Sequence, residues 1–68
     1  MPLIQATIIE GRTQEQKDAF FEGVAKVASE TLNAPLPSIR VVITEVPAEH
    51  WSIGGVNKAT LDAQKVGK

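Results

Sequence analysis

The 68-residue chain contains no cysteine and only one histidine, His50. The lack of cysteine excludes disulfides and thiolate zinc sites, and a single histidine gives little support for a structural metal centre. A chain this short buries too little apolar surface to form a robust core alone. Small domains without disulfides or metals commonly gain stability by oligomerisation. We therefore expect a single domain, residues 1–68, that holds no metal and assembles with copies of itself.

A strong charge and a long apolar run are also missing. Seven basic and eight acidic side chains give a formal net charge of -1, which offers no attraction to nucleic acid or an anionic membrane. No apolar run reaches membrane-spanning length, and the first residues do not show the cationic and apolar stretches of a signal peptide. We therefore expect a cytoplasmic protein with no nucleic-acid partner and no membrane partner.

The residues that are present predict a β-α-β unit. Leu3–Ile9 is rich in β-branched residues and predicts a strand, whereas Gln14–Leu32 has apolar residues at helical spacing. Ser38–Val46 predicts a second strand, and the pair Gly54-Gly55 favours a small C-terminal hairpin. Because a crossover containing a helix joins parallel strands, the expected fold class is α+β, with a small parallel sheet and one helix. The last ten residues are polar and are expected to be loosely held.

Both ends of the expected helix carry recognisable signals. Thr13 is a good N-cap, and Gln16, three residues later, completes a capping-box pattern. Asn33 suits the left-handed position that closes a helix, and Pro35 prevents its continuation. One helix covers only one face of such a small sheet, so several units are expected to pack together through the other face.

Pro2 is the first candidate for chemistry. On its own it is most simply the residue that begins a strand. Initiator methionine is commonly removed before a small residue, and removal of Met1 would expose a secondary amine that is fixed in a ring. An α-amino group ordinarily has a pKa of about 8. Nearby arginines and an apolar wall would lower that pKa and leave a neutral general base at physiological pH.

Two arginines are candidates for binding an anionic substrate. Arg12 lies at the strand-to-helix corner, where a solvated side chain is the simpler interpretation. Arg40 lies inside an otherwise apolar strand, and a charged group in a sheet interior needs a partner or a ligand. Glu45, five residues further along that strand, faces the opposite side. A bound carboxylate is the natural alternative, because a guanidinium binds it bidentately.

Trp51 is the only tryptophan of the chain. Packing in the core or in an interface is one interpretation, and an apolar wall beside a proline base is the other. His50 is interpreted as an exposed turn residue rather than as a ligand or a base.

Together these residues resemble the 4-oxalocrotonate tautomerase family of the tautomerase superfamily. The resemblance covers nearly the whole chain, and its segments occur in order with compatible spacing: Pro2–Gln5, Ile9–Lys17, Ala34-Pro35 followed by Ser38–Glu45, and His50–Gly55. Each segment alone is a weak signal, and the combination is specific to the superfamily. The resemblance implies a β-α-β tautomerase fold, assembled as dimers into a homohexamer, a trimer of dimers, that needs no cofactor.

The resemblance also implies roles for five residues. Pro2 matches the catalytic N-terminal proline, and Arg12 matches the arginine that binds the distal carboxylate. Arg40, presented from a neighbouring subunit, matches the arginine that polarises the 2-keto or 2-hydroxy end of the substrate. Ile9 matches an apolar wall residue, and Trp51 stands where the family has phenylalanine, which changes the volume of the wall. The implied activity is that of an isomerase that ketonises small enol acids such as 2-hydroxymuconate, a dicarboxylate of aromatic hydrocarbon catabolism.

Two other functions fit the same segments. Hydratases and dehalogenases of the superfamily, which act on 3-haloacrylates, resemble this chain but carry glutamate where it has Ile53 and arginine where it has Ile9. Both positions are apolar here, which disfavours hydration as the main activity. A non-catalytic oligomeric scaffold would keep the fold, and only the joint presence of Pro2, Arg12 and Arg40 argues against it.

Overall fold

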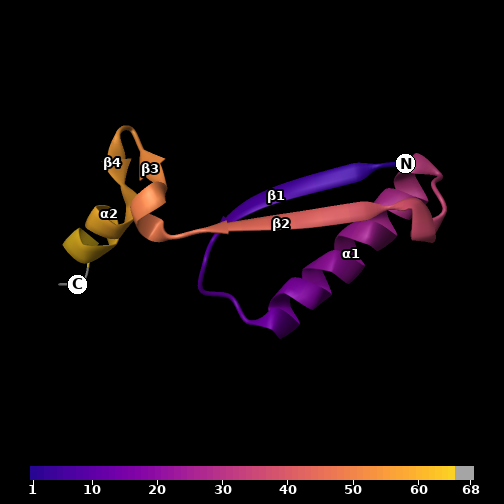
Figure 1. Cartoon of the computed structure of the whole chain (residues 1–68), viewed down its shortest axis with the longest axis horizontal. Coiled ribbons are helices and arrows are strands. Elements are labelled where there is room, and N and C mark those ends of the chain that lie inside the picture. The colour runs from indigo at the N-terminus through magenta and orange to yellow at the C-terminus, as the bar shows by residue number, and fades with distance from the viewer. Residues whose placement is uncertain (66–68) are drawn as a thin grey trace.

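A computed structural model of the protein describes residues 1–65. The elements follow one another as β1 (Leu3–Ile9), α1 (Gln14–Leu32), η1 (Leu36–Ser38), β2 (Arg40–Val46), η2 (Ala48–His50), β3 (Ser52–Ile53), β4 (Val56–Asn57) and α2 (Lys58–Lys65), where η denotes a 3-10 turn. Figure 1 shows a β-α-β body formed by β1, α1 and β2, from which the remaining elements project as an arm. In the described part of the chain, no helix is long and apolar enough to cross a membrane.

The body is a parallel pair of strands covered by α1. β1 and β2 are in register from Leu3 opposite Arg40 to Ile9 opposite Val46. Residues opposite each other in the register share a face of the sheet, and alternate residues lie on opposite faces. The half-buried face lies beneath α1 and includes Ile4, Ala6, Ile8, Val41 and Ile43. The predicted α+β fold class, with a parallel sheet, one central helix and a C-terminal hairpin, is confirmed.

The predicted ends of α1 are also confirmed. The Gln16 N–H donates to Thr13 Oγ1 at 3.1 Å, and the Thr13 N–H donates to Gln16 Oε1 at 2.9 Å, which completes the capping box. Asn33 closes the helix in the left-handed conformation, with φ 54° and ψ 46°. These signals act within one turn of chain, so they do not depend on the rest of the fold.

Two predictions about the secondary structure are wrong. The second strand begins at Arg40 rather than Ser38, because Ser38 belongs to the preceding turn η1. The Ser38 N–H and hydroxyl both donate hydrogen bonds to the Pro35 carbonyl oxygen. The polar C-terminus is not loose throughout, because Lys58–Lys65 forms helix α2. Asn57 caps this helix by accepting a hydrogen bond from the Thr60 N–H at 2.9 Å. Residues 66–68 of the predicted loose segment lie outside the described residues.

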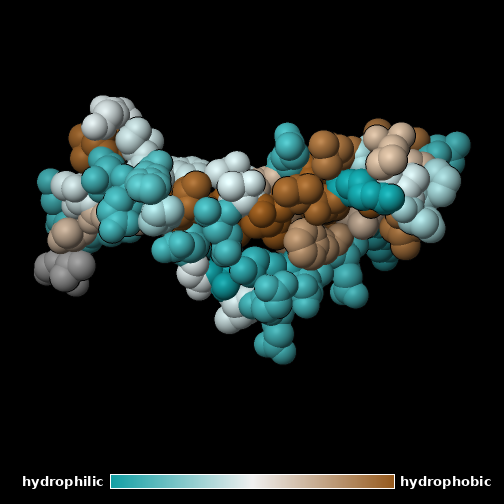
Figure 2. All heavy atoms as spheres, viewed as in Figure 1, coloured by the Kyte–Doolittle hydropathy of each residue, from teal (hydrophilic) through white to brown (hydrophobic). Residues whose placement is uncertain are grey.

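The isolated chain exposes far more surface than a protein of its mass should. Its accessible surface is 5169 Å², whereas a monomeric protein of this size exposes about 4,200 Å². Among the described residues, only Ala28 and Ile39 are buried hydrophobic residues. On the face of the sheet away from α1, Leu3 is 57% exposed and Val42 is 45% exposed. We call this the open face. Figure 2 shows the hydrophobic side chains that reach the surface around the strands and α1.

The arm, residues 47–65, extends the molecule along its longest axis. The extents of the chain are 47 × 24 × 16 Å and its radius of gyration is 15.8 Å, against about 11 Å for a compact domain of this length. The main contacts of the arm are internal, between α2, η2, β3 and β4. Gly54 and Gly55 form its hairpin turn with φ 62° and 89°, values that suit a two-residue turn with positive φ at both positions. Among residues 1–65, the arm makes its main contacts within itself, and the open face carries the exposed side chains of Leu3 and Val42.

Candidate active site

Pro2 and Arg40 are neighbours at one end of the sheet. The Arg40 N–H donates to the Pro2 carbonyl oxygen at 3.0 Å, one step before the register of β1 and β2 begins. Pro2 is half-buried, whereas Met1 before it is 86% exposed. Figure 1 shows this N-terminal end at the side of the molecule away from the arm. The ladder thus fixes the backbone of the proposed base at the end of the sheet.

The side chain of Arg40 is not in the sheet interior as predicted. Arg40 is the first residue of β2 and is exposed, and its Nη1 donates to the carbonyl oxygens of Pro37 at 2.7 Å and Ile39 at 3.4 Å. The prediction failed because the strand starts two residues later than expected, which puts Arg40 at a strand end that water can reach. Arg40 shares the open face with Leu3, opposite it in the register. In the described part of the chain it pairs with no carboxylate, so the guanidinium can meet an incoming anion.

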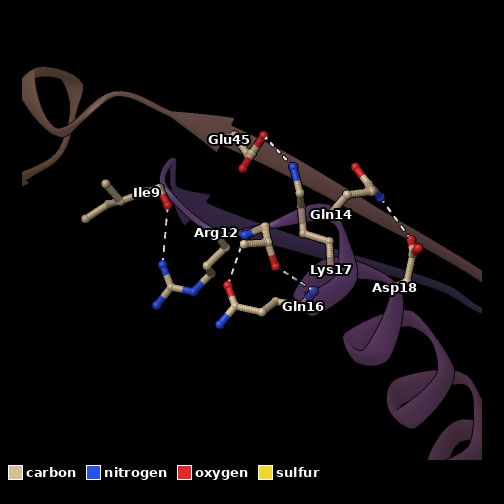
Figure 3. A network of polar contacts seen from close by, with 8 residues as sticks. Ile9, Arg12, Gln14, Gln16, Lys17, Asp18 and Glu45 are labelled. Carbon is tan, nitrogen blue, oxygen red and sulfur yellow. Dashed lines mark hydrogen bonds and ion pairs between the residues drawn. The ribbon is translucent and has the colours of Figure 1, made fainter.

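Arg12 and Ile9 lie at the opposite end of β1. Ile9 is the last residue of the strand and is half-buried, and Arg12 is exposed in the corner that leads into α1. Within the described residues the Arg12 guanidinium makes one hydrogen bond, from Nη1 to the Ile9 carbonyl oxygen at 3.5 Å (Figure 3). This bond is long, so the guanidinium is held only weakly and most of its donors are free for a ligand.

A cavity of about 300 Å³ lies beside this corner, between the start of α1 and the sheet. The polar side chains that line the cavity come from α1 and from the corner before it, and the apolar side chains come from α1 and from the sheet. The lining residues are Ile8, Arg12, Gln16, Lys17, Phe20 and Ile43. A guanidinium above an apolar floor is suited to an elongated ligand that is anionic at one end and carbon-rich in the middle.

Trp51 belongs to the arm rather than to the body. It is half-buried and follows η2, and its carbonyl oxygen accepts a hydrogen bond from the Lys58 N–H at the start of α2. The arm leaves the body after Val46, which is opposite Ile9 and therefore at the end of the sheet away from Pro2. His50, the residue before Trp51, is exposed at the end of η2, as predicted. Within one chain, Trp51 cannot form a wall beside Pro2.

The predicted site residues therefore form two groups in one chain. Pro2 and Arg40 lie at one end of the sheet, and Ile9, Arg12 and the arm with Trp51 lie toward the other (Figure 1). Seven strand residues separate Pro2 from the Arg12 corner, a distance of about 23 Å at the usual rise of a strand. This span is far longer than a six-carbon diacid, so a single chain does not carry all five residues in one site.

Sequence reasoning missed one charged pair at the corner. Lys17 Nζ lies 3.1 Å from Glu45 Oε1 and joins α1 to β2. The two residues are 28 positions apart, and only the β-α-β register, which turns Glu45 toward the helix, could have indicated the contact. The described residues contain no group of three or more histidine, aspartate or glutamate side chains that could hold a metal ion.

Comparison with known proteins decides the family. A family model described as Tautomerase enzyme matches residues 2–61, which is most of the chain. The chain belongs to the tautomerase family. This tautomerase is 54% identical over 59 residues to a probable tautomerase of Ralstonia nicotianae, in a match that covers 87% of this chain and 84% of the relative. It is 49% identical over 55 residues to the 2-hydroxymuconate tautomerase of Stutzerimonas stutzeri, covering 81% and 87%.

Solved structures place the tautomerase in the 4-oxalocrotonate tautomerase family. A heterohexamer 4-oxalocrotonate tautomerase from Chloroflexus aurantiacus superposes with a TM-score of 0.86 at 38% identity, over 90% of this chain and 98% of that chain. A 4-oxalocrotonate tautomerase isozyme from Methylibium petroleiphilum gives a TM-score of 0.90 at 33% identity, over 93% and 98%. The protein is therefore a keto–enol tautomerase, an isomerase, with the 4-oxalocrotonate tautomerase fold.

Proposed function

We propose that the active enzyme begins at Pro2 and ketonises small enol dicarboxylates such as 2-hydroxymuconate in sites shared between the chains of a homohexamer. The observation that carries the proposal is the separation of the candidate residues. Each chain has the base end and the carboxylate end of a site about 23 Å apart. Two or more chains would bring the Pro2 end of one chain against the Arg12 corner of another. The 4-oxalocrotonate tautomerase of Chloroflexus aurantiacus, a heterohexamer, supports the proposed assembly.

The uncovered surfaces of the chain support the same assembly. The open face carries Leu3 and Val42, and the arm carries Ile53, which is 56% exposed. Burial of apolar area of this kind drives association, at about 25 cal/mol for each Å² removed from water. Arg40 lies on the open face, so a chain that packs there would receive its guanidinium. Trp51 on the arm would likewise reach a site on a neighbouring chain, where it would form an apolar wall with Ile9.

The proposed reaction is a proton transfer within one molecule. The neutral Pro2 nitrogen takes the proton of the 2-hydroxyl, the C2–O bond becomes a carbonyl, and the conjugated electrons shift toward C5. The protonated Pro2 nitrogen then delivers the proton to C5, which regenerates the base. Arg40 stabilises the charge that develops on the oxygen, an effect for which one oriented donor in a dry site contributes about 3–4 kcal/mol. Arg12 holds the distal carboxylate.

A mixed-chain experiment tests whether the site is shared. Pro2→Ala replaces the cyclic secondary amine with a primary amine that no ring holds in place, and Arg12→Ala removes the distal guanidinium. Each variant alone is therefore expected to turn over 2-hydroxymuconate poorly at substrate concentrations well below KM. When the two variants are denatured together and refolded as mixed hexamers, about a quarter of the sites should combine an intact Pro2 with an intact Arg12 from different chains by random pairing. At substrate concentrations well below KM, turnover by the mixed hexamers should therefore rise above that of either variant.

The control is a mixture of the two variants that are refolded separately and combined without exchange of chains. This mixture should show only the average activity of its components. If the co-refolded hexamers are no more active than this control, Pro2 and Arg12 do not act together across a chain boundary, and the shared site is wrong.

A further inference from the structure

The corner that contains Arg12 is bonded to β2 on both sides, at the consecutive residues Glu45 and Val46. On the strand side, the Glu10 N–H donates to the Val46 carbonyl oxygen at 2.9 Å. On the helix side, Lys17 Nζ is paired with Glu45 Oε1 at 3.1 Å. Figure 3 shows Lys17 extending from α1 to Glu45, with Arg12 on the corner beside Ile9. The backbone before Arg12 and the helix after it are therefore both bonded to the same strand.

Lys17, which forms the ion pair with Glu45, is hydrogen-bonded to Thr13, the residue that follows Arg12. The Lys17 N–H donates to the Thr13 carbonyl oxygen at 3.1 Å, and the capping box closes the same turn between Thr13 and Gln16. A displacement of Lys17 therefore moves Thr13 with it. Among the described residues, Lys17 and Glu45 form the only ion pair between α1 and the sheet, since Lys58 and Asp62 pair within α2.

The position of Arg12 depends on its backbone because its side chain has little support. Its one hydrogen bond among the residues described is the long contact of 3.5 Å to Ile9. Gly11 before it has φ 131°, a conformation that residues with a side chain rarely adopt, so the corner requires glycine at that point. Arg12 and Lys17 line the same cavity, and the Lys17 ammonium is paired with the Glu45 carboxylate. Exposed fractions of 19% for the Lys17 side chain and 31% for the Glu45 side chain show a pair partly screened from water.

We propose that Lys17 and Glu45 form a positioning pair that sets where Arg12 presents its guanidinium, and so determines how strongly the enzyme prefers enols with a second carboxylate. The inference rests on the proposed function in one respect, namely that Arg12 binds the distal carboxylate. Lys17 acts through the corner and does not bind the substrate, because its ammonium is neutralised by Glu45. Loss of the pair lets the start of α1 shift on the sheet, which changes the distance between Arg12 and the base that serves the same substrate.

Steady-state kinetics of Lys17→Met and Glu45→Gln test the pair on two substrates. 2-Hydroxymuconate has a distal carboxylate, whereas phenylenolpyruvate has an apolar ring in its place. Either substitution should raise KM for 2-hydroxymuconate by about three- to tenfold, the scale expected for misplacement by a fraction of an ångström, with kcat nearly constant. KM for phenylenolpyruvate should not follow this increase. Lys26→Met makes the same chemical change elsewhere on α1 and should leave the ratio of the two KM values as in the parent enzyme.

Glu45→Gln separates positioning from direct binding. If Lys17 itself bound the substrate, removal of the Glu45 charge would free its ammonium and lower KM for the diacid, which would overturn the proposal. The exchange Lys17→Glu with Glu45→Lys restores an ion pair between the same positions and should bring KM back toward the parent value. Because partly exposed ion pairs contribute little to stability, all these variants are expected to fold, and circular dichroism checks that they do.

A double-mutant cycle with Arg12→Ala separates this inference from the proposed function. In the Arg12→Ala background, Lys17→Met should have no further effect on KM for 2-hydroxymuconate, because the group that it positions is absent. If Arg12→Ala alone leaves that KM unchanged, Arg12 does not bind the carboxylate and the proposed function fails in that respect. If Arg12→Ala raises KM but Lys17→Met and Glu45→Gln do not, or if their effects persist without Arg12, the positioning pair is wrong and the role of Arg12 stands.

Discussion

The Arg40 N–H donates a hydrogen bond to the Pro2 carbonyl oxygen at 3.0 Å. This bond extends the parallel ladder one step beyond Leu3, the first residue of β1. The pyrrolidine ring is therefore attached to a backbone that the sheet holds on its C-terminal side. On its other side, the ring nitrogen of Pro2 is bonded to Met1 in the full sequence.

Retention of Met1 should abolish activity. With Met1 attached, the Pro2 nitrogen is a tertiary amide whose lone pair is delocalised into the carbonyl group, so it cannot act as a base near neutral pH. We expect protein that begins at Pro2 to be active and protein that keeps Met1 to have little or no turnover of 2-hydroxymuconate. Intact-protein mass spectrometry gives the processing state of each sample that is assayed. Undiminished turnover by fully Met1-retained protein would refute Pro2 as the base and leave the fold unaffected.

The two arginines should differ in the kinetic constant that they control. Arg40→Ala should mainly lower kcat, by about 10²–10³-fold, because it removes a donor to charge that develops during the reaction. Arg12→Ala should mainly raise KM for a diacid, by about tenfold or more, because a hydrogen bond to a charged group contributes about 1.5–3 kcal/mol in both ground and transition states. Steady-state kinetics on 2-hydroxymuconate measure both. A dominant effect of Arg12→Ala on kcat would reverse the assignment of roles.

Trp51 should report on occupancy of the site. Its indole is the only one in the chain and is half-buried on the arm. If it lines the pocket, a dicarboxylate inhibitor should change its emission at concentrations that also inhibit turnover. Trp51→Phe keeps an apolar wall of smaller volume, so it should remain active with an altered preference among enols and should lose the fluorescence signal. A saturating inhibitor that leaves the emission of the parent enzyme unchanged would favour a packing role for Trp51.

The open face should be required for assembly. We expect native mass spectrometry at micromolar concentration to show a hexamer, because the isolated chain leaves Leu3 and Val42 substantially exposed. Val42→Glu places a charge on this face and should shift the distribution toward dimers and monomers, with loss of turnover. Val42→Thr, which has nearly the same shape, is the matched control and should stay closer to the hexamer. A parent protein that is monomeric under these conditions would exclude the shared site.

The positions of the main elements could be predicted from the sequence because their signals are local. Thr13 and Gln16 form the capping box that their spacing indicates, and Asn33 adopts the left-handed conformation that ends α1. The β-branched, largely apolar residues of Leu3–Ile9 are enough to identify β1. The parallel pairing with β2 follows from the helix between the strands. Each of these features is determined within a few residues or by chain connection alone.

The environment of the candidate site residues was decided by the tertiary structure. The sequence indicates that Arg40 is charged and near a strand, but the turn at Leu36–Ser38 places it at an exposed strand end. The pairing of Lys17 with Glu45 requires the strand register that turns Glu45 toward the helix. The separation of Pro2 from Arg12 likewise depends on β1 forming an extended strand between them. Such relationships join residues far apart in the chain, and their geometry is fixed only when the strands and the helix pack together.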